Sequence, residues 1–276
     1  MDEIKGIPGY SIEEVIHQVE LNLWETWANF GRGPGCTLHN EDDALWFETP
    51  IPIIPYNTVV RFQVEQDVDK RIDALVQGYA ERNVAPLWIV HPSSMPADLP
   101  ERLQKRGYQE IEIAPCMARS LENNLSETPS IPDGVEIREA IDEKDVMELY
   151  GLAAWRWGVP DDYRPQLEKI IEEFKVGERT SNTRFWLAWK DDVPISKVAL
   201  YNGSGSAGIY AVATKPEARG LGIASILVNV ALKAAQEMGH KLAVLDSSPL
   251  AEKLYQRLGF TTVAPLRLYS SVEAHI

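Results

Sequence analysis

Residues 207–225, AGIYAVATKPEARGLGIAS, limit what this chain can fold into and bind more than any other segment does. An apolar strand runs through a proline-containing turn into a glycine-bearing loop, and the loop opens a long helix. The first-turn amides of a helix have no partner within it, so such a loop is a ready anion site. Gly220 and Gly222 let the backbone approach a ligand without a Cβ in the way, and Arg219 adds a fixed charge. The segment therefore predicts a phosphate or pyrophosphate site.

Two other phosphate-binding motifs do not fit this loop. A Walker loop needs a lysine directly after its last glycine, but Gly222 is followed by Ile223. A dinucleotide-binding fingerprint needs a third glycine at position 225, which is Ser225. We therefore expect neither a nucleoside triphosphate nor a dinucleotide here.

The net charge and the cysteine content argue against several kinds of partner and ligand. The 276 residues carry 27 Lys and Arg against 41 Asp and Glu, a formal net charge of −14. Clustered basic residues hold nucleic acids and anionic membranes, so we expect neither as a partner. Cys36 and Cys116 are far apart and lack ligand-spaced histidines, so we expect no metal site and no disulfide. The N-terminus lacks a signal-peptide pattern and no apolar run could span a membrane, so we expect a cytoplasmic protein.

A polar stretch with two prolines divides the chain. We expect domains at residues 1–122 and 135–276, joined by a linker at 123–134. Strands and helices occur in both halves, which predicts an α/β fold, and the strands within 184–213 are joined by short turns as an antiparallel meander. Ser11 with Glu14 forms a capping box. The predicted helices are 11–30, 68–82, a short one through 99–103, 143–157, 166–176, 223–238 and 250–258. The predicted strands are 44–47, 58–64, 86–90, 109–118, 136–138, 184–189, 195–201, 207–213, 241–246 and 261–269.

The two halves end alike, with a helix, a glycine, an aromatic residue and a strand. When Gly107 is placed on Gly259, Leu103 stands opposite Tyr255. A repeat of this kind indicates duplication. The alternative is that this is a common way for a chain to leave a helix.

Arg219, Gly222 and Ala224 form the pattern Arg-x-x-Gly-x-Ala between a strand and a helix, and residues 254–260 read LYQRLGF. In these features residues 136–269 resemble the GCN5-related N-acetyltransferase (GNAT) family. The resemblance implies two tandem domains, each a mostly antiparallel sheet with splayed central parallel strands flanked by helices. The first half lacks the phosphate loop and looks like a degenerate domain without a CoA site. It would complete the substrate cleft or pair its sheet edge with the second half.

The resemblance also implies acetyl-CoA as co-substrate, with no metal. Acetyl-CoA would lie where strands 207–213 and 241–246 splay, and its pantetheine arm would pair with the backbone of one strand. The implied cofactor-binding residues are Val212, Ala213, Thr214, Arg219, Gly220, Leu221, Gly222, Ile223, Ala224 and Ser225.

Direct attack of an amine on the thioester needs an acid and a base. Tyr255 matches the family tyrosine that protonates the thiolate; alternatively it packs the helix on the sheet. The strand 207–213 carries no carboxylate, so Asp246 is the candidate base or amine anchor, and its alternative role is to cap the next helix.

Aromatic and acidic residues suited to a cation mark the candidate substrate site. They are Trp155, Trp157, Asp161 and Tyr210; the alternative is that the tryptophans are core and Asp161 is solvated. We expect an acetyl-CoA-dependent N-acetyltransferase, monomeric or homodimeric, that acts on the primary amine of a small molecule. The alternatives are a protein or peptide N-acetyltransferase, or a non-catalytic acyl-CoA sensor.

Overall fold

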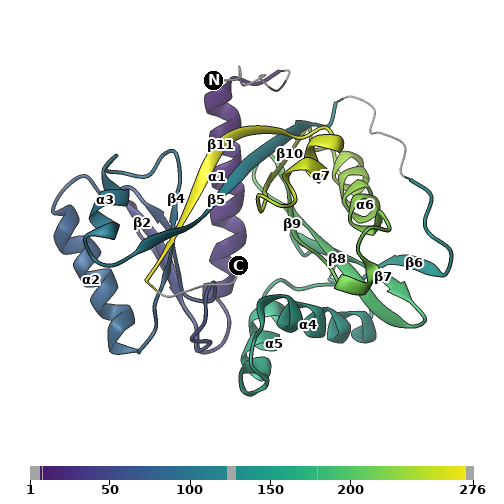
Figure 1. The fold of residues 1–276 in the computed structure, drawn as a ribbon, viewed down its shortest axis with the longest axis horizontal. Coiled ribbons are helices and arrows are strands. Elements are labelled where there is room, and N and C mark those ends of the chain that lie inside the picture. Colours follow the sequence, from purple (N-terminus) through teal and green to yellow (C-terminus); the bar gives the residue numbers. More distant parts are fainter. Residues whose placement is uncertain (1–6, 8, 123–128, 179, 272–276) are drawn as a thin grey trace. The chain divides into compact units, whose positions relative to one another are not determined.

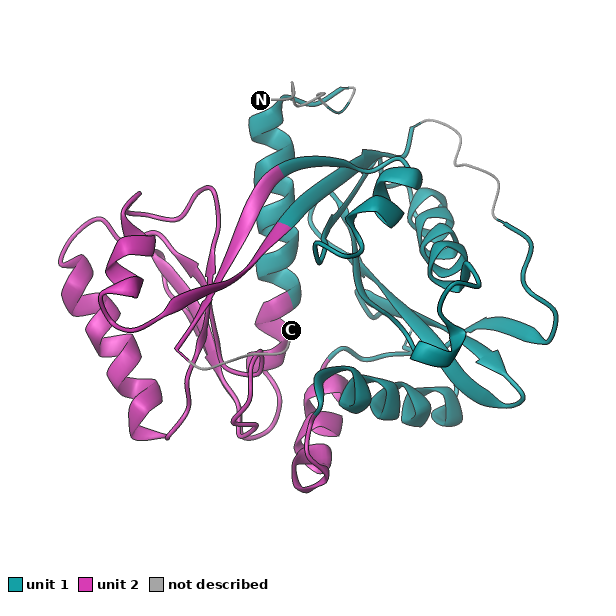
Figure 2. Ribbon diagram, viewed as in Figure 1, with its two compact units in different colours: residues 1–26, 115–158, 174–263 teal, residues 27–114, 159–173, 264–276 magenta. Residues whose placement is uncertain are grey.

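The computed structural model describes Ile7 and residues 9–122, 129–178 and 180–271. The chain forms two compact units, made of residues 1–26, 115–158 and 174–263 (unit 1) and of residues 27–114, 159–173 and 264–276 (unit 2; Figure 2). Each unit therefore contains segments from both sides of the predicted linker. Residues 123–128 of that linker lie outside the described residues.

The sheet of unit 1 has the strand order β5-β10-β9-β8-β7-β6 (Figure 1). Among its described strands, β9 and β10 pair in parallel and the other neighbours pair antiparallel. This mixed sheet confirms the predicted fold class. The strands are β5 (Gln109–Ser120, within unit 1 from Pro115), β6 (Val135–Glu139), β7 (Thr183–Lys190), β8 (Val193–Asn202), β9 (Ala207–Thr214) and β10 (Leu242–Asp246).

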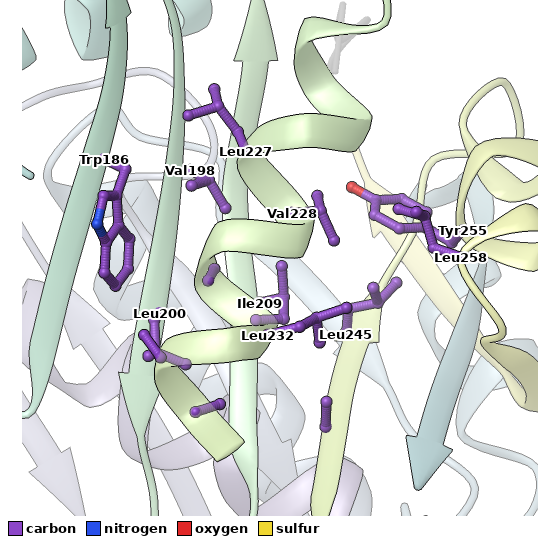
Figure 3. Packing of buried hydrophobic residues seen from close by; sticks show 14 of the residues in the cluster. Trp186, Val198, Leu200, Ile209, Leu227, Val228, Leu232, Leu245, Tyr255 and Leu258 are labelled. Atoms are coloured by element: carbon purple, nitrogen blue, oxygen red, sulfur yellow. The ribbon is translucent and has the colours of Figure 1, made fainter. Parts of the chain in front are cut away.

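The apolar stripe of helix α6 (Ile223–Glu237) builds the core of unit 1. Leu227, Val228 and Leu232 pack against strand residues that include Ile209 and Leu245 (Figure 3). A fully buried leucine contributes about 1.5–3 kcal/mol of apolar burial, so this face anchors α6 and its N-terminal loop on β9. Unit 1 also contains α4 (Glu143–Trp157), η3 (Pro216–Ala218), α7 (Glu252–Arg257) and α1 (Ile12–Ala28) as far as residue 26.

Unit 2 repeats the plan with a smaller sheet, in the order β1-β2-β3-β4-β11. β3 pairs with β4 in parallel, and an isolated parallel bridge joins Gln63 to Met95. Its strands are β1 (Thr37–Asn40), β2 (Ala44–Glu48), β3 (Thr58–Phe62), β4 (Leu87–Val90) and β11 (Thr261–Ser270, within unit 2 from Ala264). Its helices are η1 (Asn29–Gly31), α2 (Val68–Glu81), α3 (Leu99–Gln104), η2 (Asp161–Tyr163) and α5 (Arg164–Glu172). Leu103, the counterpart of Tyr255, is fully buried in the core of this unit.

The two halves of the chain exchange their closing strands. β5, from the first half, pairs with β10 in a register that runs from Leu242 opposite Ser120 to Asp246 opposite Cys116. β11, from the second half, pairs with β4. The expectation that the first half would pair a sheet edge with the second is confirmed by the β5–β10 ladder.

Local sequence signals determine most of the element ends. The capping box at α1 is present: the Ser11 amide donates to Glu14 Oε2 at 2.7 Å, and the Glu14 amide donates to Ser11 Oγ at 3.2 Å. The predicted helix 143–157 matches α4, and Asp142 caps it by accepting from the Asp145 amide. β1 is a strand that the sequence analysis did not predict, because its residues TLHN show no apolar alternation.

A fragment of residues 130–276 is expected to fold poorly. It lacks α1 and β5, so the interior strand β10 becomes an edge whose backbone groups have lost their antiparallel partners. We expect an aggregated or molten fragment by gel filtration and near-ultraviolet circular dichroism, next to a folded full-length chain. A soluble fragment with a cooperative unfolding transition would contradict this prediction.

Candidate functional site

The parallel strands β9 and β10 pair over a short distance and then separate. The register contains Ala243 opposite Ala207 and Val244 opposite Gly208, whereas β9 continues to Thr214. The remainder of β9 therefore has an edge that β10 does not cover. The predicted splay of the central parallel strands is present, and it leaves backbone groups for a ligand to pair with.

A β-bulge lies in β9 within this uncovered part. Lys197 on β8 stands opposite Ala213, and Ala199 stands opposite Tyr210, so Ala211 and Val212 together face Val198. Ala211 is exposed and has a φ of 53°, in the left-handed region that costs a non-glycine residue about 1–2 kcal/mol. A bulge leaves its extra residue outside the ladder, so backbone polar groups of this strand are available to a ligand.

The loop between β9 and α6 forms an open cradle. Gly220 and Gly222 have φ angles of 78° and 76°, which favour glycine, and a Cβ at either position would meet nothing within 4 Å. Gly222 is the N-cap residue of α6, and its carbonyl accepts the first helical bond, from the Ile226 amide, at 3.1 Å. The first-turn amides before Ile226, those of Ile223, Ala224 and Ser225, have no acceptor within the helix.

Arg219 fastens this cradle to the strand. Its Nε donates to the carbonyl of Thr214, the last residue of β9, at 3.1 Å. The next exposed side chain, Leu221, is 47% accessible, so the loop stays open to solvent. The result is a set of outward-facing amides at the positive end of a helix dipole, which suits a pyrophosphate.

Tyr255 on α7 combines a packed ring with a free hydroxyl. The ring is buried in the α6 core (Figure 3). It makes an edge contact with Phe260 at a centroid distance of 5.9 Å. Burial raises the pKa of the hydroxyl far above its usual value, and the charge of Asp246 raises it further. Among the described residues the hydroxyl has no hydrogen-bond partner. The packing role and the acid role suggested by the sequence are therefore compatible in one side chain.

Asp246 lies at the carboxyl end of β10, on the face of the sheet turned away from α6. Ile209 and Leu245 face α6, so alternation places Tyr210 and Asp246 on the opposite face. Cys116 is the register partner of Asp246 and shares that face. α7 begins at Glu252 with Ala251 as its N-cap residue, so Asp246 does not cap that helix.

Helix α1 covers this face with polar side chains. Asn22, only 1% accessible, donates from Nδ2 to the Ser206 carbonyl at 2.9 Å and accepts from the Tyr210 hydroxyl at 2.9 Å. Glu20 and Thr26 are also buried. The second half alone does not supply this side of the site, because α1 comes from the first half.

The remaining predicted substrate residues are divided between the units. In unit 1, Trp155 is 39% accessible, and the Arg156 guanidinium lies 4.7 Å from the ring centroid of Trp157. Asp161 belongs to η2 of unit 2, where its carboxylate pairs with Arg164 Nε at 2.8 Å and is 86% accessible. That exposure agrees with the alternative of a solvated helix start.

Sequence reasoning overlooked a buried lysine on β8. Lys197 is 3% accessible, and its pKa is lowered to about 8 by burial and, secondly, by the positive charge of Arg156. The available signal was a single charge inside the apolar strand ISKVALY. Asn22 and Glu20 were also overlooked. Their signal was similar, because each is a polar residue that interrupts the apolar stripe of α1.

Membrane-spanning helices and clusters of metal ligands are both absent from the residues that the structure describes. None of their helices is both long and apolar enough to cross a membrane. They contain no group of three or more His, Cys, Asp and Glu side chains that could hold a metal ion.

Comparisons with known proteins agree with this geometry. The model of the acetyltransferase (GNAT) family matches residues 146–260, which include the cradle and Tyr255. Among solved structures, a GCN5-related N-acetyltransferase from Kribbella flavida is 15% identical, with a TM-score of 0.67 over 95% of this chain and 97% of that one. Another, from Sphaerobacter thermophilus, is 15% identical, with a TM-score of 0.60 over 96% of both chains.

A tandem GNAT protein from the clavulanic acid biosynthesis pathway is 12% identical, with a TM-score of 0.60 over 95% of this chain and 97% of that one. At these identities the likeness shows the fold, and it extends over both halves of the chain. No curated protein matches the sequence significantly.

Replacement of Lys197 by methionine is expected to stabilise the protein. The lysine binds its proton less tightly when folded, with a pKa of about 8 against a usual value near 10.5, so folding is penalised fully below pH 8. The penalty is about 3 kcal/mol at pH 7 and falls to about half of that near pH 9.5. Urea unfolding of both proteins at the two pH values measures it. An equal or lower stability of Lys197→Met at pH 7 would contradict the prediction.

Proposed function

This chain carries an acetyltransferase domain of the GNAT family at residues 146–260, and we propose that it transfers the acetyl group of acetyl-CoA to a primary amine of a small molecule. The observation that carries the proposal is the continuity of β9 and its loop. One strand supplies an uncovered bulged edge, and the loop that follows supplies an open cradle of helix amides. These two features suit two adjoining parts of a CoA molecule, its pantetheine arm and its pyrophosphate.

The chain's own residues fit that co-substrate. The backbone of Val212, Ala213 and Thr214 would pair with the amides of the pantetheine arm as an added strand does. The amides from Gly220 to Ser225 would hold the pyrophosphate, with Arg219 fixing the loop through Thr214. Because the formal charge of the chain is −14, these amides and the nearby cations must provide the local attraction for an anionic ligand.

The reaction joins the amine nitrogen to the acetyl carbon and breaks the bond from that carbon to sulfur. The sulfur leaves as a thiolate and takes a proton from the Tyr255 hydroxyl, which is protonated at neutral pH, and the amine nitrogen gives up its proton to Asp246 or to water. Neither Cys36 nor Cys116 takes part. Burial raises the pKa of both thiols, which opposes the thiolate that an acyl-enzyme would need.

Asp246 is the proposed base or amine anchor. It ends the strand that separates from β9. Its charge acts on Tyr210, which lies on the same face of the sheet, and on Tyr255, which lies on the α6 face. A carboxylate at that point attracts an ammonium group and can accept a proton from it, directly or through water. β9 itself carries no carboxylate, whereas Asp246 ends the strand that separates from it, which supports this role.

The acetyl-CoA site can be tested with a matched pair of glycine variants. Gly222 and Gly239 have φ angles of 76° and 89° and open space at their Cβ positions, so glutamate causes similar backbone strain at either. Only Gly222 lies in the cradle. Calorimetric titration should show one acetyl-CoA site per chain, weakened at least about 30-fold in Gly222→Glu by charge and bulk and unchanged in Gly239→Glu. Absent binding, or equal binding by both variants, would refute the site.

Tyr255→Phe is expected to lower kcat by about 100-fold or more, since a positioned general acid contributes on the order of 10²–10⁴. The affinity for acetyl-CoA and the free energy of unfolding should hardly change, because the hydroxyl makes no hydrogen bond with the described residues. Release of CoA thiol with an identified amine measures the rate. Full activity in Tyr255→Phe would show that another group protonates the thiolate.

A further inference from the structure

Four polar side chains form a row on the sheet face turned away from α6. They come from neighbouring strands: Cys116 on β5, Asp246 on β10, Tyr210 on β9 and Lys197 on β8. Asp246 stands opposite Cys116 in the ladder. Lys197 shares its face with Ala199, the register partner of Tyr210, since residues two apart in a strand lie on one face. Val198, between them, faces α6 (Figure 3).

One end of this row is acidic. Asp246 lies on β10, and Glu20 reaches the same region from α1 with 2% of its surface accessible. Both carboxylates raise the pKa of Cys116, after burial, which places both near that thiol. A positively charged or polarised amine therefore finds complementary charge at this end.

The other end is basic and is not neutralised by the protein. Within Ile7 and residues 9–122, 129–178 and 180–271, neither Lys197 nor Arg156 makes an ion pair or a hydrogen bond. Lys197 is 97% buried, and the nearest charge acting on it is the like charge of Arg156 from α4. A buried ammonium without a partner costs several kcal/mol. The chain has 41 acidic residues against 27 basic ones, so a shortage of acidic residues does not explain why Lys197 has no carboxylate partner among the described residues.

We propose that Lys197 and Arg156 bind the carboxylate of the acceptor, so that the substrate is an amino acid held with its amine toward Asp246. This assignment rests on the proposed acetyl transfer and names its substrate class. The bound carboxylate would raise the pKa of Lys197 toward its usual value, and it would offset the repulsion between Lys197 and Arg156. The guanidinium can contribute a bidentate contact and the ammonium a compact charge.

Strand β9 lies between the two charged ends of the row. Asp246 ends β10 on one side of β9, beyond the point where the two strands separate, and Lys197 lies on β8 on the other side. Lys197 is two residues from Ala199, the register partner of Tyr210. Two ordinary strand spacings and two residues would give about 12 Å between the Cα atoms of Asp246 and Lys197, and the separation of β10 from β9 lengthens this gap.

The phosphates of CoA are a poorer match for Lys197. Their cradle is the N-terminus of α6, and Lys197 points to the face of the sheet that α6 does not cover. The anion that we expect Lys197 to bind is therefore a different group from the pyrophosphate that the cradle would hold. An acceptor with an amine and a carboxylate supplies it.

The test uses the full-length protein with acetyl-CoA and pairs of acceptors that differ only in the carboxylate: lysine and cadaverine, tyrosine and tyramine, histidine and histamine, and the remaining common amino acids with their decarboxylated amines. We expect kcat/KM for the preferred amino acid to exceed that for its amine by at least about 100-fold. Lys197→Met should remove most of that ratio. Lys190→Met, at an exposed position on β7, removes the same charge and should keep it.

Each other result has a distinct meaning. Acetylation of amines as fast as of amino acids, or a ratio that survives in Lys197→Met, overturns the carboxylate site while acetyl transfer stands. Binding of acetyl-CoA without acetylation of any amino acid also overturns it. If acetyl-CoA does not bind, in a titration that requires no acceptor, the proposed function itself fails. Loss of the ratio in both lysine variants would make the effect one of general charge and would equally reject a role for Lys197.

Discussion

The structure depends on the unequal pairing of strand β10. On one side it forms an antiparallel ladder with β5 over its whole length, and on the other it meets β9 at two register pairs and then separates. Backbone hydrogen bonds must be satisfied somewhere, so the ladder with β5 is what allows β10 to leave β9 without becoming disordered. The uncovered edge of β9 and the position of Asp246 at the end of β10 both follow from that asymmetry.

Local signals in the sequence were sufficient for the open glycine loop at the start of α6 and for most elements. Arg219, Gly222 and Ala224 act within one loop, and the box of Ser11 with Glu14 acts within one helical turn, so short-range chemistry determines both. The exchange of β5 and β11 could not be predicted in this way. Both strands follow a helix and a Gly-aromatic pair, and nothing in their alternation shows which sheet each will join.

The polar face of the site was also hidden from pattern reading. Asn22 and Glu20 interrupt an apolar helix stripe, and Lys197 interrupts an apolar strand, so each is a local exception whose meaning depends on partners far away in sequence. Asn22 finds its partners at Ser206 and Tyr210. Residues that break a local rule are where function is expected to concentrate, because natural sequences otherwise agree across levels. Lys197 fits that description. Its burial lowers the stability of the folded protein, and it places a positive charge where we propose that the acceptor carboxylate binds.

The strand exchange also determines when the site can exist during synthesis. Cys116 is synthesised well before its ladder partner Asp246, which lies 130 residues later in the chain. At translation speeds of roughly 5–20 residues per second, β5 leaves the ribosome about 7–26 s before β10. During that interval β5 is an unpaired edge rich in apolar residues, a target for chaperones or for other nascent chains. A ribosome that stalled after the first half would release no functional part, since the nascent chain becomes an enzyme only when nearly all of it has emerged.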